Sequence, residues 1–303
     1  MKLGIFGKKS ETTVGFIGLG IMGSRMAENL AKAEIPLFVY NRTKEKAEEL
    51  LKYPNVTWKD SPAKVAKEVD VLFTMLSTPQ IVEELAYGDD GFLTKLKKTS
   101  TWVDCTTVNP QFSMTMADNS LKRAIHFLDA PAAGSAEPAQ NGELTFFVGG
   151  ENAQIKKCEP YFNAMGKQVI HVGKYGKGSA LKMVFNLMLG QAMQGFAEGM
   201  LLGESLGLSQ DFLFDTLLQS PVAAPFLANK RTFLSREENP TEFPLWLMQK
   251  DLQLAADTAY AHDLSLPAVN HIKEIYSLAR QKGMGDKDFS AIYQFLKPKT
   301  DQS

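Results

Sequence analysis

Short apolar runs alternate with amphipathic stretches through the first half of the chain. Val14–Ile17 and Leu37–Tyr40 are apolar runs of strand length, and residues 22–33 between them have the 3.6-residue periodicity of a helix. The alternation continues with a predicted helix at 44–51 and with predicted strands at 69–75, Thr101–Asp104 and 125–129. Because strands that alternate with helices build parallel sheets, we predict a doubly wound α/β domain here, with helices on both faces of the sheet.

From about residue 180 onward the periodicity is helical only, with interruptions at Pro221, Pro240 and Pro267. We expect a long helix over about 179–206 that joins the first half to an all-helical C-terminal part. The chain is therefore divided into an N-terminal extension at 1–13, an α/β domain at 14–178 and an all-helical domain at 179–303.

Three glycines stand four residues apart in the predicted long helix, at Gly195, Gly199 and Gly203. An interior glycine costs a helix about 1 kcal/mol relative to alanine, so such a stripe needs a reason. Close backbone packing against another helix is the favoured interpretation. A contact between subunits is the second.

The composition is that of a globular protein without a strong electrostatic field. Among 303 residues, Lys and Arg number 33 and Asp and Glu number 34. This balance provides no general attraction to nucleic acid or to an acidic membrane surface, so any phosphate site must be local. The two cysteines, Cys105 and Cys158, have no metal-ligand spacing and favour a reducing compartment.

The most apolar long stretch, 181–202, does not have the character of a membrane span. It carries five polar residues and is predicted to be a buried helix. The first ten residues have too short an apolar run for a secretory signal, so we expect a cytoplasmic protein with no membrane partner. The four histidines form no metal-ligand pair at helical spacing, and no metal is expected.

A glycine-rich turn follows the first predicted strand, with the sequence Gly18-Leu19-Gly20-Ile21-Met22-Gly23. The pattern G-x-G-x-x-G is weak alone, but here it follows a strand, opens a helix and precedes a second strand, which is the context of dinucleotide binding. Gly18 permits the tight turn, Gly20 lets backbone N–H groups approach a pyrophosphate, and Gly23 allows close packing of helix on strand. We therefore predict a nicotinamide dinucleotide site.

The end of the second strand distinguishes the two nicotinamide cofactors. An acidic residue there would bond the adenosine 2′-hydroxyl and repel a 2′-phosphate. This chain has Asn41-Arg42-Thr43 instead. Because the Arg42 guanidinium can bind a 2′-phosphate, with neutral donors from Asn41 and Thr43, NADP(H) is predicted in preference to NAD(H).

Lys182 and Asn186 lie four residues apart near the start of the long predicted helix, and therefore share one face. Partial burial among apolar neighbours would lower the proton affinity of Lys182, as suits a general acid that protonates a carbonyl oxygen. Asn186 could hold the lysine and bind the substrate. The alternative is a surface lysine whose stem packs on apolar residues.

The segment Pro131-Ala132-Ala133-Gly134-Ser135 follows the strand that ends at Asp129. Gly134 and Ser135 expose backbone N–H groups and a hydroxyl donor, which together could bind a carboxylate. A simple glycine turn explains the segment equally well.

Taken together, these residues resemble the β-hydroxyacid dehydrogenase family, which includes 3-hydroxyisobutyrate dehydrogenases. The resemblance extends from about Val14 to Leu296, and as an ordered set its motifs are highly specific. Five blocks carry it: 18–23, 129–144, 176–182 with Asn186, 243–251 and 285–291.

The resemblance implies roles for residues that spacing alone would not select. Lys182 is similar to the family's catalytic lysine and Asn186 to its substrate-orienting asparagine. Further residues match positions that line the cofactor (Leu76, Ser77, Thr107 and Lys250) or the substrate pocket (Phe243 and Asp251). The family also implies a Rossmann-type N-terminal domain, a helical C-terminal domain for substrate binding and oligomerisation, and a homodimer or homotetramer.

Within the family, Asn41-Arg42-Thr43, residues 134–139 and Phe243-Pro244-Leu245 are most similar to glyoxylate/succinic semialdehyde reductases, which use NADPH. One departure concerns Ala133, because members usually carry a serine there whose hydroxyl contacts the substrate carboxylate. Its loss removes about 1–3 kcal/mol if the partner is left unpaired, which places glyoxylate specificity in question.

The leading hypothesis is thus an NADPH-dependent reductase of short aldehyde and keto carboxylic acids, succinic semialdehyde and glyoxylate first. A 3-hydroxyisobutyrate-type NAD(P)-dependent dehydrogenase is the nearest alternative. An imine reductase is disfavoured because those relatives generally replace the residue found here as Lys182. A non-catalytic NADP(H)-binding interaction module is the alternative of another class.

Overall fold

The computed structural model describes residues 12–235 and 239–298. The chain forms two compact units, with the boundary between Ser179 and Ala180, and each unit has a hydrophobic core of its own. The sequence analysis placed this boundary one residue earlier. The expected N-terminal extension at 1–13 lies almost wholly outside the described residues.

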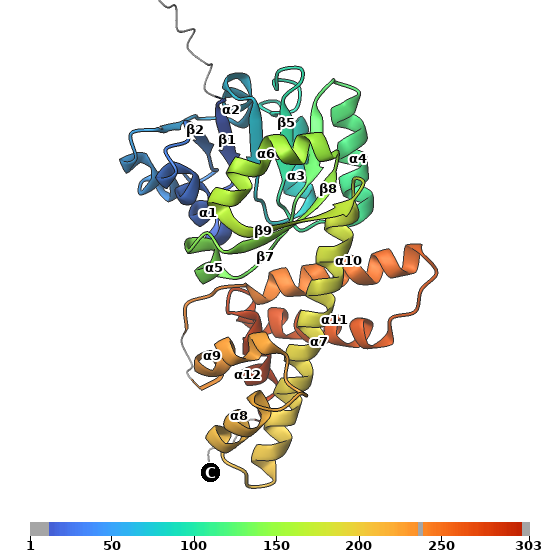
Figure 1. The fold of residues 1–303 in the computed structure, drawn as a ribbon. Helices are drawn as coiled ribbons and strands as arrows, with labels where there is room; N and C mark the ends of the chain where they lie inside the picture. The colour runs from blue at the N-terminus through green and yellow to red at the C-terminus, as the bar shows by residue number, and fades with distance from the viewer. Residues whose placement is uncertain (1–11, 236–238, 299–303) are drawn as a thin grey trace, which may run out of the picture. The chain divides into compact units, whose positions relative to one another are not determined.

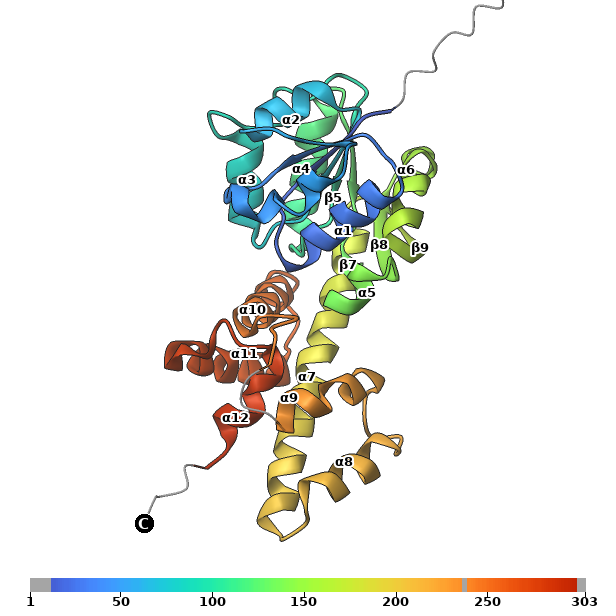
Figure 2. The same ribbon diagram turned by 90° about the vertical axis from the view of Figure 1, so that its left-hand side faces the viewer.

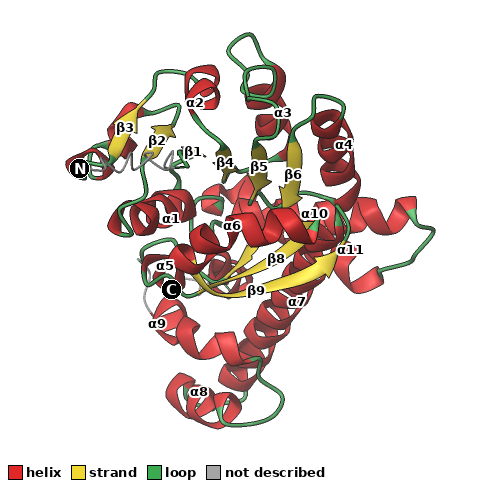
Figure 3. Cartoon of the chain, turned by 45° about the horizontal axis from the view of Figure 1, so that its top comes forward, coloured by secondary structure: helices red, strands yellow, loops and turns green. Residues whose placement is uncertain are grey.

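The first unit is built on one sheet with strand order β3-β2-β1-β4-β5-β6-β8-β7, and β9 pairs with β8 (Figure 1, Figure 3). The strands from β3 to β6 are parallel, whereas β8 runs antiparallel to β6 and β7. The mainly parallel sheet is the one that the alternating pattern predicted, and the order β3-β2-β1-β4-β5-β6 is that of the Rossmann-type domain that the family resemblance implied. The strands are β1 Val14–Ile17, β2 Leu37–Tyr40, β3 Val56–Trp58, β4 Val71–Thr74, β5 Thr101–Asp104, β6 His126–Asp129, β7 Ala132–Ala133, β8 Leu144–Gly150 and β9 Gly166–Gly173.

Three helices of this unit start at a polar cap followed by proline. Ser61, Thr78 and Asn109 each accept a hydrogen bond from the backbone N–H three residues later in the chain. The proline that follows each cap fits the first helical position, because the backbone N–H that it lacks would have no partner within the helix. The helices of the unit are α1 Ile21–Lys32, α2 Pro62–Glu68, α3 Pro79–Tyr87, α4 Pro110–Leu121, α5 Ala136–Gln140 and α6 Asn152–Met165.

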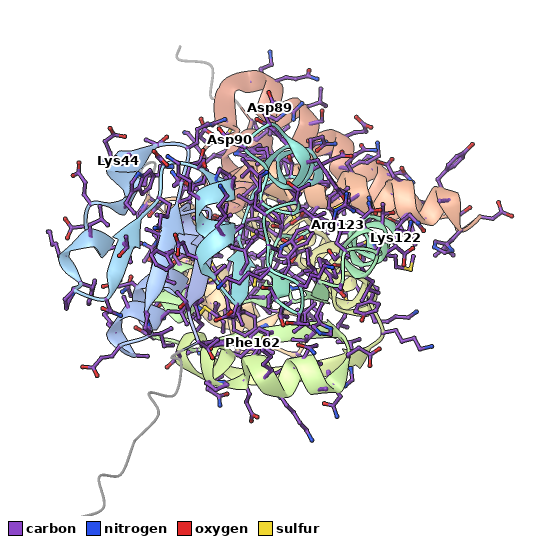
Figure 4. All side chains as sticks on the ribbon, turned by 90° about the horizontal axis from the view of Figure 1, so that it is seen from above. Lys44, Asp89, Asp90, Lys122, Arg123 and Phe162 are labelled. Atoms are coloured by element: carbon purple, nitrogen blue, oxygen red, sulfur yellow. The ribbon has the colours of Figure 1, made fainter. Side chains whose placement is uncertain are left out.

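Alternate residues of the central strands face two different cores. Phe73 points into the core shared with α1 and α6, where its ring meets that of Phe162 edge-on, with 6.0 Å between the ring centroids. Figure 4 shows the position of Phe162 on α6. Leu72, the neighbour of Phe73, faces the second core, which α2, α3 and α4 supply (Figure 2). Since side chains alternate across a strand, both faces are covered, as a parallel sheet requires.

The prediction of an α-helix at 44–51 is wrong. The structure has two short 3₁₀ helices instead, Lys44–Ala47 and Leu50–Lys52. Ala47 and Leu50, one from each of these short helices, are the two buried residues of the segment. The segment is otherwise charged and exposed, so it lacks the apolar stripe that an α-helix of this length would need.

The second unit contains helices and, among its described residues, no strand beyond an isolated bridge between Pro244 and Asp288. This agrees with the helical periodicity. No helix in the described part of the chain is long and apolar enough to cross a membrane. The elements of the second unit are α7 Lys177–Ser205, α8 Gln210–Leu218, η3 Pro225–Lys230, α9 Arg231–Ser235, α10 Leu245–Ala261, α11 Pro267–Ala279, η4 Arg280–Met284, η5 Phe289–Ala291 and α12 Ile292–Leu296. The first turn of α7 belongs to the first unit.

The three glycines of α7, Gly195, Gly199 and Gly203, differ in what surrounds them. A Cβ on Gly203 would lie 2.6 Å from Leu213, so this glycine permits the close packing that the sequence suggested. Cβ atoms on Gly195 and Gly199 would meet nothing within 4 Å. The packing interpretation is therefore wrong for these two, whose helix face is open in the single chain.

Candidate active site

The glycine turn between β1 and α1 has the geometry of a phosphate cradle. Gly18 has φ +100°, and a Cβ there would lie 2.3 Å from the carbonyl oxygen of Met75. A Cβ on Gly23 would lie 2.0 Å from the carbonyl oxygen of Gly18. A Cβ on Gly20, in contrast, would point into open space. Two glycines are thus required by packing, and the third leaves the turn open for a ligand.

The N-terminus of α1 lies at this opening. Its cap residue, Gly20, has no side chain to satisfy the first-turn N–H groups. The turn lies beside Met75, where β1 is flanked by β2 on one side and β4 on the other. Ligands of doubly wound sheets bind at this switch point, and helix N-termini bind phosphates, so the residues present fit a dinucleotide pyrophosphate.

The end of β2 is tied to the glycine turn by Asn41. Its Oδ1 accepts from the Leu19 N–H at 2.9 Å, and its Nδ2 donates to the Thr43 carbonyl at 2.9 Å. Asn41 therefore orders the two loops, a role the sequence analysis did not anticipate. Arg42 and Thr43 are exposed beside it.

A further cation near this loop was missed by the sequence analysis. Lys46 lines a groove of about 500 Å³ together with Ser24 and Arg25 of α1. The sequence could have indicated Lys46, because it lies only four residues after Arg42. In the structure it stands on the 3₁₀ turn that replaces the expected helix.

The loop after β4 is held by a buried network at the end of β5. The Leu76 N–H donates to Thr106 Oγ1 at 3.0 Å, and the Thr106 N–H donates to Asp104 Oδ1 at 3.1 Å. Thr74 Oγ1 also donates to Asp104 Oδ1. Burial raises the pKa of Asp104 to about 6, although these hydrogen bonds oppose the shift. Asp104 thus orders the loops that carry Leu76, Ser77 and Thr107, which sequence reasoning did not predict.

Asp129, at the end of β6, holds the first turn of α7. Its carboxylate accepts from the N–H groups of Gly176 at 2.8 Å and Ser179 at 2.9 Å. The Ser179 hydroxyl is also hydrogen-bonded to that of Ser113, at 2.8 Å. Burial raises the pKa of Asp129 to about 6, against the effect of the backbone donors.

The segment proposed for a carboxylate lies between β7 and α5. Gly134 has φ +132°, a conformation that favours glycine. Ser135 is the cap residue of α5 but its side chain makes no capping hydrogen bond. Ala133 pairs with Thr145 in the sheet and is partly exposed.

Helices α7 and α10 bring together four candidate residues of the second unit: Lys182, Asn186, Lys250 and Asp251. Asn186 Nδ2 donates to Asp251 Oδ2 at 2.6 Å, and both residues are buried. Lys250 Nζ lies 2.9 Å from Asp251 Oδ1. Burial lowers the pKa of Lys182 to about 8, with Asp251 raising it and Lys250 lowering it. The hydrogen bond of Asn186 goes to Asp251, whereas the sequence analysis had it holding Lys182.

Phe243 packs against the hydrophobic core of the second unit. Its N–H donates to Asp288 Oδ2 at 3.2 Å, and its ring packs against that of Phe289 at 5.6 Å between centroids. Among the described residues, no hydrogen bond joins Phe243 to Lys182, Asn186 or Asp251. No cluster of potential metal ligands occurs among the described residues.

Comparison with known proteins adds independent support. Residues 13–173 match the model for the NAD-binding domain of 6-phosphogluconate dehydrogenase. Residues 176–296 match the NAD-binding domain of NADP-dependent 3-hydroxyisobutyrate dehydrogenase. The fold, the glycine turn and these matches define an NAD(P)-dependent oxidoreductase that acts on CH–OH groups.

Full-length relatives identify the family. Glyoxylate/succinic semialdehyde reductase 2 of Arabidopsis thaliana is 35% identical over 285 residues, covering 94% of this chain and 79% of the relative. Mitochondrial 3-hydroxyisobutyrate dehydrogenase of Bos taurus is 35% identical, covering 95% and 88%. The solved 3-hydroxyisobutyrate dehydrogenase of Mycobacterium tuberculosis, with L-serine, has a TM-score of 0.84 at 28% identity, covering 95% and 99%. The chain belongs to the β-hydroxyacid dehydrogenase family.

The compartments of these relatives differ. The Arabidopsis protein is named as chloroplastic and the bovine one as mitochondrial. A cytoplasmic location therefore stays a prediction for this chain.

Proposed function

We propose that the chain is an NADPH-dependent reductase that converts short aldehyde and keto carboxylic acids, succinic semialdehyde and glyoxylate among them, to hydroxy acids. The observation that carries the proposal is the Lys182–Asn186–Asp251–Lys250 cluster, a lysine of lowered pKa beside a buried amide and carboxylate. Such a group is suited to proton transfer near neutral pH.

The cofactor is proposed to bind the first unit. The turn 18–23 takes the pyrophosphate, Leu76, Ser77 and Thr107 line the nicotinamide half, and Lys250 is proposed as the cofactor-binding residue of the second unit. Arg42 and Thr43 take the 2′-phosphate, and Lys46 adds a second positive charge at the same loop. When bound, NADPH supplies a hydride to the carbonyl carbon of the substrate.

Lys182 is proposed to act as the general acid. It donates a proton from Nζ to the carbonyl oxygen as negative charge develops there, and Asn186 orients that oxygen. A pKa of about 8 keeps most of the amine protonated at pH 7 while leaving it a stronger acid than an exposed lysine.

The carboxylate of the substrate is proposed to bind the Gly134–Ser135 turn, and Phe243 is proposed as a further substrate-binding residue. Ser135 has a hydroxyl that the helix cap does not use. Because Ala133 offers no hydroxyl, the site has fewer donors than the usual family pattern, which favours a substrate whose longer chain supplies apolar contact. Succinic semialdehyde fits this requirement better than glyoxylate.

A 3-hydroxyisobutyrate-type dehydrogenase is the second candidate, and the bovine and mycobacterial relatives favour it. It uses the same lysine, in the oxidative direction, as a base. Cofactor preference and the substrate panel below separate the two.

The test is NADPH oxidation, followed at 340 nm, with succinic semialdehyde, glyoxylate and longer keto acids, and NADP⁺ or NAD⁺ reduction with 3-hydroxyisobutyrate. We expect turnover of at least one aldehyde acid, with a higher kcat/KM for NADPH than for NADH. Lys182→Ala should lower kcat by about 10²–10⁴-fold with little change in the KM for NADPH. Lys282→Ala, at an exposed lysine of η4, is the control.

Two results would contradict the proposal. NADPH binding without turnover of any carbonyl acid would favour a binding module. Full activity in Lys182→Ala would remove the general-acid role.

A further inference from the structure

The carboxylate of Asp251 is directed into the protein rather than toward an open surface. The residue is 5% exposed, Oδ2 accepts the Asn186 amide at 2.6 Å, and Oδ1 faces the Lys250 ammonium at 2.9 Å. Oδ2 thus accepts a hydrogen bond, whereas Oδ1 is paired with Lys250 by charge and accepts no hydrogen bond within the described chain. This differs from the substrate-lining role that family resemblance suggested for the residue.

The partner of Asn186 decides how its amide is oriented. An ionised carboxylate only accepts hydrogen bonds, so the atom of Asn186 that meets it at 2.6 Å must be Nδ2. Oδ1 and one remaining N–H of the amide then face away from Asp251. A partner that could both donate and accept would permit either orientation.

Asp251 also determines the charge around Lys182. Within the described chain, the charged groups that act on Lys182 are Asp251, which raises its pKa, and Lys250, which lowers it, both from α10. One carboxylate thus opposes both the burial of the lysine and a second positive charge.

We propose that Asp251 is a positioning residue: it fixes the orientation of the Asn186 amide and balances the charge of Lys182, without itself contacting the reacting atoms. The proposal rests on the proposed function of Lys182 and Asn186. Its two parts, the hydrogen-bond acceptor and the negative charge, can be tested separately.

Asp251→Asn removes the charge and permits both amide orientations. The pKa of Lys182 should fall below about 8, by roughly one unit for loss of a nearby opposite charge. A general acid works in its protonated form, so the alkaline decline of kcat for carbonyl reduction should begin about one pH unit lower. We expect kcat to fall more than tenfold, with a smaller change in KM for the carbonyl acid.

Asp251→Glu keeps the charge but displaces the acceptor, which should leave the pKa of Lys182 near its original value and still lower kcat. It also serves if Asp251→Asn does not fold. Asp257→Asn, an exposed carboxylate on the same helix, is the matched control and should change neither quantity.

A readout independent of turnover is the acetylation rate of Lys182 by acetic anhydride against pH, measured by peptide mass spectrometry on the NADPH-bound protein. A lower pH midpoint of acetylation in Asp251→Asn supports the positioning role of Asp251, whether or not any carbonyl acid is reduced. If no carbonyl acid is reduced, that result counts against the proposed function and not against the positioning role. An unchanged midpoint together with a raised KM and an unaltered kcat would make Asp251 a substrate contact and overturn the proposal.

Discussion

Two neighbouring residues at the end of β2, Asn41 and Arg42, have different roles in the proposed choice between NADPH and NADH. Asn41 makes both its hydrogen bonds within the protein, to Leu19 and Thr43, whereas Arg42 is exposed. The guanidinium of Arg42 is thus the side chain free to meet a 2′-phosphate. Sequence patterning identified Arg42 as a candidate but could not show that Asn41 is already occupied, because hydrogen bonding depends on the tertiary fold.

Arg42→Ala should therefore raise the KM for NADPH by about tenfold or more, since charge-assisted hydrogen bonds contribute about 1.5–3 kcal/mol each. The KM for NADH should change less than twofold, because NADH has no 2′-phosphate. Steady-state kinetics with both cofactors measures the difference, with Arg123→Ala, at an exposed arginine just after the C-terminal end of α4, as the control. An equal rise for both cofactors would mean that Arg42 maintains the loop rather than binding the phosphate.

At the scale of elements, the turn between β1 and α1 separates structural from ligand-facing glycines. Gly23→Ala should destabilise the first unit by more than about 2 kcal/mol, because its Cβ would lie 2.0 Å from a backbone oxygen. Gly20→Ala should leave stability within about 0.5 kcal/mol, since its Cβ meets nothing, yet raise the KM for NADPH by placing a methyl group in the phosphate cradle. Urea unfolding and cofactor titration measure these effects. If Gly20→Ala binds NADPH normally, the pyrophosphate lies elsewhere.

The regular elements were predictable because their patterns are local. Short apolar runs identified β1, β2 and β5, and the 3.6-residue period identified α1 and α7, in each case nearly to their ends. The strands β3, β7, β8 and β9 were not predicted, since short or glycine-containing strands depend on pairing with neighbours. Of the candidate site, Lys182 and Asn186 were found by helical spacing, whereas the Asn186–Asp251 hydrogen bond joins residues 65 positions apart and could not be.

At the scale of the whole molecule, chemistry is divided between the two units. The first unit carries the phosphate turn and the loops after β2, β4 and β5. The second carries the cluster of α7 and α10 that we propose for proton transfer. Each group is ordered by hydrogen bonds inside its own unit, including those of Asp104 and Asp251.

The open face of α7 leads us to propose a homodimer or homotetramer. Met188 and Leu202 are more than 60% exposed on this helix, on which Gly195 and Gly199 leave room for another backbone. Light scattering should give a multiple of the 33.5 kDa chain mass. Met188→Asp with Leu202→Asp should reduce it to a single chain, and Leu278→Asp on α11 should not. A monomer in the unaltered protein would contradict this prediction.

The bridge that Asn41 forms from Leu19 to Thr43 has a consequence for how cofactor preference can change over evolution or by design. Adaptation is easiest at positions that carry one duty, and Arg42 and Thr43 are such positions, because they can be replaced without disturbing the pyrophosphate turn. Asn41 has two duties, so a substitution there alters the anchoring of both cofactors at once. Routes from NADPH toward NADH use should therefore begin at Arg42 and leave Asn41 in place.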